Sequence, residues 1–515
     1  MKMRTLLVLG LALASSKVSS LFRFLKTFLL VLGLGFAQAE ERSHSRLVSQ
    51  GPDGKLIYYQ YTDQGDRLPD FSWCGYRGGG VALPRLTVKV TIEPVSEGDD
   101  TKRIQDAIKT VSALPLDQNG FRGAVLLKRG AYRIGSMLNI NASGVVLRGE
   151  GDGEDGTVLI ATARRKYYVM LIKGGGEPRE LEGTKQEILA DYVPVGARTF
   201  KVKDASAYKV GDNLMVCRVG NQQWIDEIGM KKVNSWKPFT MKFQRVVKEV
   251  TKDTVTVDAP IVNSIDKQWG GGYLVRYDWP DRIENVGVEG IRCDSVYSSP
   301  TDHAHAWRFV VFEKAQNVWV RDCTALHMAY TAVQFMNTVK WATVQDTKCL
   351  DMISEKEGGL RYPFCIIGQL CLVQRCFASE GRHDFVVQYW VPGPNVFLDC
   401  KSKNSHSDSG PHQRWSTGTL YDNVVTAKLI VQNRGSSGSG HGWAGAQFVF
   451  WNCNARLVKA DQPPTAQNFA IGCAGENLSG SGYYESKNVP VAPRSLYLKQ
   501  LEDRLGPEAV KNSQQ

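Results

Sequence analysis

A short strand pattern that ends in cysteine recurs through the second half of the chain. Each copy alternates β-branched or aromatic residues with other residues, as in NVWVRDC (317–323) and NVFLDC (395–400). The cysteines placed in this way are Cys293, Cys323, Cys349, Cys376, Cys400 and Cys453. The first four steps are 30, 26, 27 and 24 residues, a spacing typical of a solenoid. We therefore predict a stack of coils, each contributing a strand to a long parallel sheet.

The cysteines of this pattern are predicted to lie inside the coils. Equivalent residues of successive coils stack about 4.8 Å apart, so inward positions form ladders. A free cysteine there behaves as a small hydrophobic residue. Disulfides and metal ligation are the alternatives, although no CxxC pair with zinc spacing occurs. The 53 residues between Cys400 and Cys453 leave room for one more coil, with its strand at 429–433 and Asn433 in the cysteine position.

Residues 98–114 carry the pattern of an amphipathic helix, with Asp99 and Asp100 as candidate N-caps. The apolar face consists of Ile104, Ala107, Ile108 and Val111. Such a helix can cover the open end of the first coil, which would otherwise expose core and strand edges.

The coil pattern is interrupted once, between 177 and 280. Segments 200–219 and 253–260 have the alternation of strands in a separate antiparallel sheet. The predicted organisation is a signal peptide at 1–39, a cap and first coils at 40–176, an inserted β-rich subdomain at 177–280, main coils at 281–480 and a C-terminal tail at 481–515.

The first 39 residues have the composition of an export signal. They contain five basic residues, no acidic residue and two apolar runs that are short for a membrane span. The second run leads into Ala37-Gln38-Ala39, the small-x-small pattern that signal peptidase needs. We predict cleavage after Ala39 and a secreted or periplasmic protein, with a retained N-terminal anchor as the alternative. Cleavage would lower the formal net charge from +11 to about +6, which suits an acidic polysaccharide better than nucleic acid outside the cell.

Four motifs near the start of the expected mature chain carry a family resemblance. They are DFSWCGYRGGG (70–80), DDTKRIQDAI (99–108), VLLKRGAYRI (125–134) and GVVLRGEG (144–151). They resemble the opening of right-handed parallel β-helix proteins of the pectate-lyase-like superfamily. The resemblance covers essentially the whole mature chain and implies an all-β, right-handed parallel β-helix. It does not name a reaction, because lyases, glycoside hydrolases, epimerases and surface binding proteins share this scaffold.

Polar residues gather in SEGRHDF (379–385) and NSHSDSGPHQRWSTG (404–418). Cleavage of an acidic polysaccharide by β-elimination needs a cation for the carboxylate, a base for the C5 proton and an acid for the leaving oxygen. Arginine suits the first task and histidine the other two. The candidate catalytic residues are His412, Arg414, His383, His406, Arg382 and Asp408. His412 and Arg414 are two residues apart and would project together from a strand, which makes them the favoured base and clamp.

Further candidates would bind the sugar chain. They are Trp415, Tyr389, Trp390, His327 and His441. The aromatic residues could offer a flat surface to a sugar ring, with packing in the core as the alternative. His327, His383 and His406 follow the same repeated strand in different coils, so we expect them on one flank.

Two alternatives to a lyase remain open. Asp384 and Asp408 each follow a cysteine by eight residues, so they could stack as the two carboxyl groups of a glycoside hydrolase. A non-catalytic glycan-binding or surface β-helix is the second alternative. Within the lyase hypothesis, calcium is another way to neutralise a uronate: Glu380, Asp384 and Asp408 are possible ligands, although their spacing matches no compact calcium loop and no cofactor is required. We expect a monomer that binds neither nucleic acid nor, after signal cleavage, a membrane.

Overall fold

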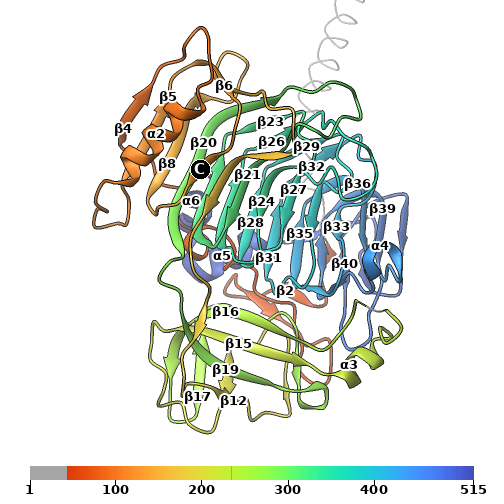
Figure 1. Cartoon of the computed structure of the whole chain (residues 1–515). Helices are drawn as coiled ribbons and strands as arrows, with labels where there is room; N and C mark the ends of the chain where they lie inside the picture. Colours follow the sequence, from red (N-terminus) through yellow and green to blue (C-terminus); the bar gives the residue numbers. More distant parts are fainter. Residues whose placement is uncertain (1–42, 234) are drawn as a thin grey trace, which may run out of the picture. The chain divides into compact units, whose positions relative to one another are not determined.

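A computed structural model describes residues 43–233 and 235–515, and residues 44–515 form one compact unit (Figure 1). The predicted signal peptide lies outside the described residues. Within those residues, no helix has the length and hydrophobicity needed to cross a membrane.

The main body is a right-handed parallel β-helix, in which each coil contributes strands to three parallel sheets. The first sheet contains β4 (Val88–Ile92), β5 (Gly123–Leu127), β8 (Val145–Gly151), β20 (Ile283–Ser295), β22 (Ala315–Arg321), β25 (Lys340–Gln345), β28 (Cys371–Gln374), β31 (Asn395–Leu398), β35 (Thr419–Asp422), β38 (Val449–Trp451), β40 (Phe469–Ile471) and β42 (Tyr483–Glu485). The second contains β6 (Gly130–Ile134), β9 (Thr157–Ala161), the end of β20, β23 (Thr324–Leu326), β26 (Lys348–Leu350), β29 (Phe377–Ser379), β32 (Lys401–Lys403), β36 (Val425–Val431), β39 (Asn454–Ala460) and β41 (Asn477–Ser479). The third contains β7 (Leu138–Ile140), β10 (Tyr167–Lys173), β21 (Ala306–Glu313), β24 (Thr331–Phe335), β27 (Phe364–Ile366), β30 (Phe385–Val387) and β33 (Gly410–Pro411). The predicted fold class is confirmed.

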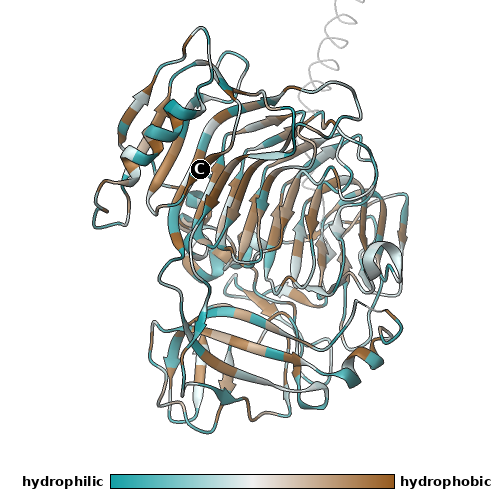
Figure 2. Ribbon diagram, in the orientation of Figure 1, coloured by the Kyte–Doolittle hydropathy of each residue, from teal (hydrophilic) through white to brown (hydrophobic). Residues whose placement is uncertain are grey.

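Inward side chains of neighbouring coils stack in register and form the core. One ladder of the first sheet runs through Val288, Val320, Val344, Val373, Phe397, Tyr421, Phe450 and Ala470. In the third sheet, Phe364 stacks on Phe385 with ring centroids 5.8 Å apart. Figure 2 shows hydrophobic residues concentrated on the coil strands. This burial is the main source of the solenoid's stability, because each coil can cover its apolar faces only against its neighbours.

The corner between the first and second sheets explains the cysteine repeat. Six corner residues have φ between 49° and 54°: Asp322, Asp346, Arg375, Asp399, Asn423 and Asn452. Asp and Asn tolerate this left-handed region better than most residues. The next residue of each coil is buried: Cys323, Thr347, Cys376, Cys400, Val424 and Cys453. The thiols donate to backbone carbonyls of the preceding coil, as Cys400 does to Val373 at 3.4 Å.

Two details of the predicted cysteine ladder are wrong. Cys293 and Cys349 lie in the second sheet, in register with Ala325 rather than with the corner cysteines. Asn433 does not occupy the cysteine position, because residues 429–431 belong to the second-sheet strand β36; the equivalent residue is Val424. All eleven cysteines are buried and free, as the hydrophobic interpretation predicts.

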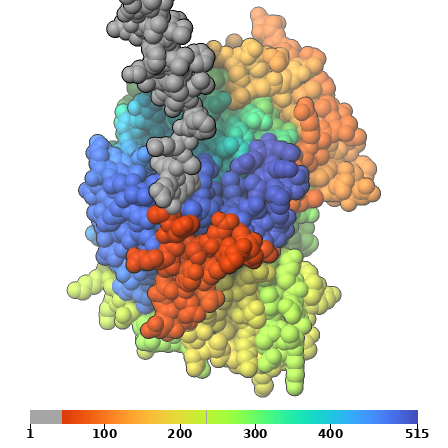
Figure 3. All heavy atoms as spheres, turned by 180° about the vertical axis from the view of Figure 1, so that it is seen from behind, coloured from red at the N-terminus to blue at the C-terminus, as the bar shows by residue number. Residues whose placement is uncertain are grey.

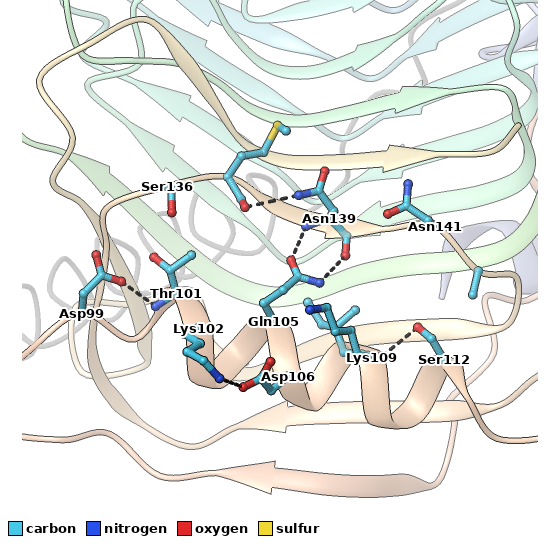
Figure 4. Close-up of a pocket in the computed structure, with 13 residues that line it drawn as sticks. Asp99, Thr101, Lys102, Gln105, Asp106, Lys109, Ser112, Ser136, Asn139 and Asn141 are labelled. Carbon is cyan, nitrogen blue, oxygen red and sulfur yellow. Dashed lines mark hydrogen bonds and ion pairs between the residues drawn. The ribbon is translucent and has the colours of Figure 1, made fainter.

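Helix α2 (Thr101–Ser112) covers the first coil with the predicted apolar face buried. Asp100 occupies the N-cap position without a side-chain capping bond, while Asp99 accepts a hydrogen bond from the Thr101 amide. Gln105 accepts from the Asn139 amide at 2.7 Å and donates to its carbonyl at 3.0 Å (Figure 4). The Gln105 side chain thus makes the backbone hydrogen bonds that a neighbouring strand would make with β7, which is the edge strand of the third sheet.

The insertion forms an antiparallel sheet. Its strands are β11 (Arg179–Glu180), β12 (Gln186–Glu187), β14 (Thr199–Lys201), β15 (Asn213–Gly220), β16 (Phe239–Val250), β17 (Thr254–Val257) and β19 (Gly272–Asp278). A further pair, β13 (Tyr192–Val193) and β18 (Ile265–Asp266), leads into the short helix η2 (Lys267–Trp269), and α3 (Gln222–Glu227) follows β15. The exact domain boundaries stay predictions.

Residues 481–515, expected to be a tail, hold helices α5 (Leu496–Leu505) and α6 (Pro507–Gln514). Their buried residues pack on the outer face of the first sheet together with Phe71 of the N-terminal segment. Figure 3 shows this N-terminal segment lying beside the C-terminal part and the insertion. The backbone amides of Leu56 and Phe71 donate to Asp503 and Gln500 of α5, which joins the two ends of the described chain.

Candidate active site

A row of six aromatic and imidazole rings follows the third sheet from coil to coil. The ring row consists of Trp307, Tyr330, Tyr362, His383, His412 and His441. Trp307 stacks on Tyr330 at 5.9 Å between ring centroids, and Tyr330 lies 5.2 Å from Tyr362. His412 lies 5.3 Å from Tyr362 and 4.6 Å from each of His383 and His441. Three candidate histidines from separate segments therefore meet in one place.

His383 is held in a defined tautomer. It is 2% exposed, and its Nδ1–H donates to the backbone carbonyl of Asp408 at 2.7 Å. Nε2 then carries the lone pair, and this atom is buried without a hydrogen-bond partner. Burial lowers the pKa of His383 to about 4, with a smaller opposing effect from the Asp408 carboxylate. His383 is therefore neutral near pH 7, with an unoccupied acceptor.

His412 follows β33, the edge strand of the third sheet. Its amide donates to Val387, and its Nε2 lies 3.1 Å from the hydroxyl of Tyr362. Gly410 brings this strand close to the next segment, since a Cβ there would lie 2.2 Å from the carbonyl oxygen of Ile430. Nδ1 of His412 is buried without a partner. Burial, followed by His383 and the Arg434 charge, lowers the pKa of His412 far below its ordinary value.

Tyr362 places a protonated phenol beside the histidines. It is 3% exposed, and burial raises its pKa to about 12. Its ring also meets that of His383 edge-on, with the centroids 5.0 Å apart. The hydroxyl can therefore give or accept a proton through the hydrogen bond to His412.

Asp408 and Arg434 form a buried ion pair next to His383. Oδ1 of Asp408 also lies 3.6 Å from Nδ1 of His383. Burial acts to raise the pKa of Asp408, but Arg434 and then His383 outweigh it, and the pKa falls below its ordinary value. Asp408 is therefore an anion that can stabilise a charged His383.

The predicted pairing of His412 with Arg414 is wrong. Arg414 has φ of 51°, so the strand alternation stops there. Its side chain donates to the carbonyl and hydroxyl of Ser439 and lies over the ring of Tyr389 at 5.2 Å. Arg382, the other predicted clamp, donates to the carbonyl of Gly358. Both arginines are half-buried, and their charges act on His441.

The expected flank of His327, His383 and His406 does not form. His406 bonds to Glu380 at 2.8 Å, and His327 bonds to Asp294 at 2.8 Å beside Tyr297. The offsets from the cysteines differ, and left-handed residues such as His327 itself, with φ of 59°, redirect the chain after each strand.

Two tryptophans predicted to bind sugar are packing residues. Trp415 is completely buried, and its indole N–H donates to Asn263 of the insertion at 2.8 Å. Trp390 packs on Phe239 of β16 with ring centroids 3.8 Å apart. Both belong to the hydrophobic contact between coils and insertion, which sequence pattern does not reveal. Tyr389 is 43% exposed and stays a candidate for substrate contact.

The carboxylates do not form the predicted hydrolytic pair. Asp384 is completely buried, accepts a hydrogen bond from Ser405, and has its pKa raised to about 6 by burial. Asp408 is occupied by Arg434. The pair therefore does not present two carboxyl groups to a polymer.

The proposed calcium ligands are engaged separately: Glu380 with His406, Asp384 with Ser405 and Asp408 with Arg434. Across residues 43–233 and 235–515, no group of three His, Cys, Asp or Glu side chains is arranged to hold a metal ion.

Trp307, Tyr330, Tyr362 and Arg434 belong to the site without having been predicted. The sequence held a signal for Trp307 and Tyr362, because an aromatic or imidazole residue lies two residues before a buried phenylalanine at 307–309, 362–364 and 383–385. Arg434 had no comparable signal, since it reaches Asp408 from across a turn.

The chain was compared with family models, curated proteins and solved structures. No family model and no curated protein matches the chain. Among solved structures, it is similar to the tailspike protein gp49 of Pseudomonas phage LKA1, at 13% identity over 75% of this chain and 66% of that chain, with a TM-score of 0.44. It is also similar to the tailspike gp61 of Pseudomonas phage phi297, at 14% identity over 76% and 66%, with a TM-score of 0.41.

A third similar structure is the tailspike of E. coli bacteriophage HK620 in complex with a pentasaccharide, at 10% identity over 84% of this chain and 61% of that chain, with a TM-score of 0.40. The chain thus spans 61 to 66% of the length of these three proteins. At such identities and TM-scores, the likeness assigns no function to this chain.

Proposed function

We propose that this chain is a secreted polysaccharide lyase that cleaves a uronate-containing polysaccharide by β-elimination at the ring row. The observation that carries the proposal is the buried pair His383 and His412, each with one unpartnered ring nitrogen, near the charges of Arg382 and Arg434. Burial keeps both imidazoles neutral, the protonation state that a base needs.

His383 is proposed as the base. Its Nε2 lone pair takes the C5 proton of the uronate, the C5–H electron pair becomes the C4–C5 double bond, and the C4–O bond breaks. The imidazolium formed keeps its Nδ1–H on the carbonyl of Asp408 and gains the nearby carboxylate as a counter-charge. This partner is favourable because His383 is almost fully buried.

Tyr362 is proposed as the acid for the leaving oxygen. Its raised pKa keeps it protonated until a stronger base, the departing alkoxide, is present. The proton passes to that oxygen, and His412, whose Nε2 lies 3.1 Å from the hydroxyl, is proposed to donate its Nε2–H to the phenolate that remains. The products are an unsaturated uronate and a new reducing end.

Arg382 and Arg414 are proposed to neutralise the uronate carboxylates. They are half-buried, whereas His383 and Tyr362 are buried, so a polymer meets these two arginines first, while Arg434 stays paired with Asp408. A guanidinium binds a carboxylate through two parallel hydrogen bonds, which suits this role. Tyr389 adds an exposed ring beside Arg414.

Non-catalytic glycan binding is the second candidate. It is favoured by the burial of the rings, since His383, Tyr362 and His412 are only 2%, 3% and 8% exposed. A polymer held on the arginines alone would be bound without being cleaved.

The test is incubation of the protein with pectic, alginate-like and glucuronate-containing polymers, with unsaturated uronates followed by absorbance and reducing ends followed in parallel. A lyase produces both signals together. Reducing ends without unsaturated product would indicate a hydrolase and contradict the proposal, while retention on a polymer with neither signal would support binding alone.

Two matched variants assign the base. His383→Asn should lower turnover by about 10²- to 10⁴-fold, the usual contribution of a general base. His327→Asn removes a histidine that lies outside the ring row and should leave turnover unchanged. Equal turnover in both variants would remove His383 from the mechanism, provided that both unfold at the wild-type temperature.

A further inference from the structure

A cavity lies where the N-terminal segment, the insertion and the last coils meet. Its volume is about 660 Å³, within the range of small-molecule sites. Its lining includes Tyr61, Tyr192, Arg218, Asp266, Trp269 and Gln447. None of them belongs to the ring row, so this cavity is separate from the proposed active site.

Arg218 is the unusual residue of this cavity. It is 3% exposed, and its Nε and Nη1 are buried without hydrogen-bond partners. Its guanidinium lies over the ring of Trp224 at 4.0 Å, and no carboxylate in the described part of the chain forms a salt bridge with it, although the Asp266 charge acts on it. Burial lowers its pKa to about 9. An uncompensated buried cation is costly, so the site favours an anion.

The two acidic residues of the cavity are already bonded to the protein. Asp66 accepts from the Tyr192 hydroxyl at 2.8 Å and from the amide of Val195. Asp266 accepts from the amide of Gln268 and caps η2, although its charge still acts on Arg218. Neither occupies the free N–H groups of the guanidinium.

The remaining wall has the composition of a sugar site. Trp269 is half-buried, and Tyr61 donates to Gln447 at 2.9 Å. Gln64, Gln268 and Gln462 add amide groups that can bond to hydroxyls. Aromatic rings flanked by a few fixed polar groups are typical of pockets that bind small polar ligands.

We infer that this cavity binds one carboxylate-bearing sugar residue, a uronate, with its carboxylate on Arg218 and its ring beside Trp269. The guanidinium lines the cavity, and two of its nitrogens lack a protein partner, so it can act as the cation that receives a carboxylate. Trp224 covers the opposite face of the guanidinium and is fixed by its own bond to Thr465 at 3.0 Å. This site would hold a polymer or product away from the ring row, whether or not His383 acts as a base.

The experiment is titration calorimetry of the whole protein with D-galacturonate, D-galactose and acetate at low ionic strength. We expect saturable galacturonate binding, with galactose and acetate each at least tenfold weaker. Galactose binding as tightly as galacturonate would overturn the carboxylate assignment. Acetate binding as tightly would reduce the cavity to an anion site and overturn the sugar assignment.

Three variants locate the binding. Arg218→Met keeps an apolar contact with Trp224 and should weaken galacturonate binding at least tenfold, and Trp269→Ala should weaken it through loss of the ring. His383→Asn should leave it unchanged. Loss of binding in His383→Asn, with retention in Arg218→Met, would place the sugar at the ring row and overturn the inference. Trp269→Ala keeps the test decisive if Arg218→Met does not fold.

Discussion

The imidazole of His383 and Asp408 are joined at two points. Nδ1–H donates to the Asp408 carbonyl at 2.7 Å, and the same nitrogen lies 3.6 Å from Oδ1 of the Asp408 side chain. The backbone contact sets the tautomer, while the carboxylate, held by Arg434, sets the local charge. Both contacts come from Asp408, which lies 25 residues after His383 in the next coil. They therefore form only when the solenoid is folded.

Stability should fall at acidic pH partly because of His383. Burial lowers its pKa from 6.5 to about 4, so the unfolded state binds more protons between these values. This contribution is fully present above pH 6.5 and is lost as the pH falls towards 4, at a cost of about 3 kcal/mol. The free energy of unfolding of wild type and His383→Asn can be measured by urea unfolding at several pH values between 4 and 7. We expect this free energy to change less steeply with pH in the variant. An equal slope in both proteins would contradict this assignment.

Asp384 should affect the pH dependence of stability in the opposite direction to His383, and the Asp384→Asn variant tests this. Burial raises the pKa of Asp384 from 3.8 to about 6, so its protonated form stabilises the native state at low pH and this contribution is lost as the pH rises through 6. Relative to wild type, the variant should gain about 3 kcal/mol between pH 4 and pH 8. The same variant should keep its turnover, because Asp384 faces the core. A loss of turnover in a folded variant would restore Asp384 to the reaction.

Arg434→Met should destabilise the protein by about 3 to 5 kcal/mol, because it leaves Asp408 buried without its partner. The matched control is Arg494→Met, which breaks the pair with Asp399, where the arginine side chain is 51% exposed. We expect about 1 kcal/mol or less for that change. Urea unfolding at pH 7 compares the two variants. Similar losses of unfolding free energy would contradict the buried-pair assignment, because the Asp408 pair would then contribute no more than a surface pair.

The thiols should be inert in the native protein. All eleven cysteines are buried, and burial raises the pKa of those at the corners, such as Cys323 and Cys376. A thiolate-specific reagent should therefore label none of them before unfolding and all eleven after it, without a reductant. Fewer than eleven labelled thiols after unfolding would point to disulfides and contradict the free-cysteine assignment.

The variants Trp415→Ala and Tyr389→Ala should distinguish a residue that stabilises the fold, Trp415, from one that contacts the polymer, Tyr389. Trp415 is completely buried against the insertion, so its removal should cost about 3 to 5 kcal/mol. Tyr389 is 43% exposed, so its removal should leave unfolding almost unchanged and weaken binding to an acidic polymer. Urea unfolding and polymer affinity measured on both variants test this, and the reverse pattern would reinstate Trp415 as the sugar contact.

The sequence by itself determined the repeat. Strand alternation and cysteine spacing predicted stacked coils, and the amphipathic pattern of 98–114 predicted the covering helix, because both are local periodicities of the sequence. The six-cysteine ladder needed correction at Cys293, Cys349 and Asn433. Strand ends are set by left-handed corner residues such as Asp399, and a spacing argument alone does not locate them.

The contacts within the candidate site could not be predicted from local sequence patterns. The sequence placed His383, Asp408 and His412 among the candidates, but it paired His412 with Arg414 and offered Trp415 to the substrate. Tertiary structure decided that Tyr362 contacts both histidines, that Arg434 holds Asp408 and that Trp415 packs against the insertion. These contacts join residues from separate turns and coils, so they depend on how far each connecting turn carries the chain. Local pattern fixes the strands, whereas the geometry of the turns between them fixes which side chains meet.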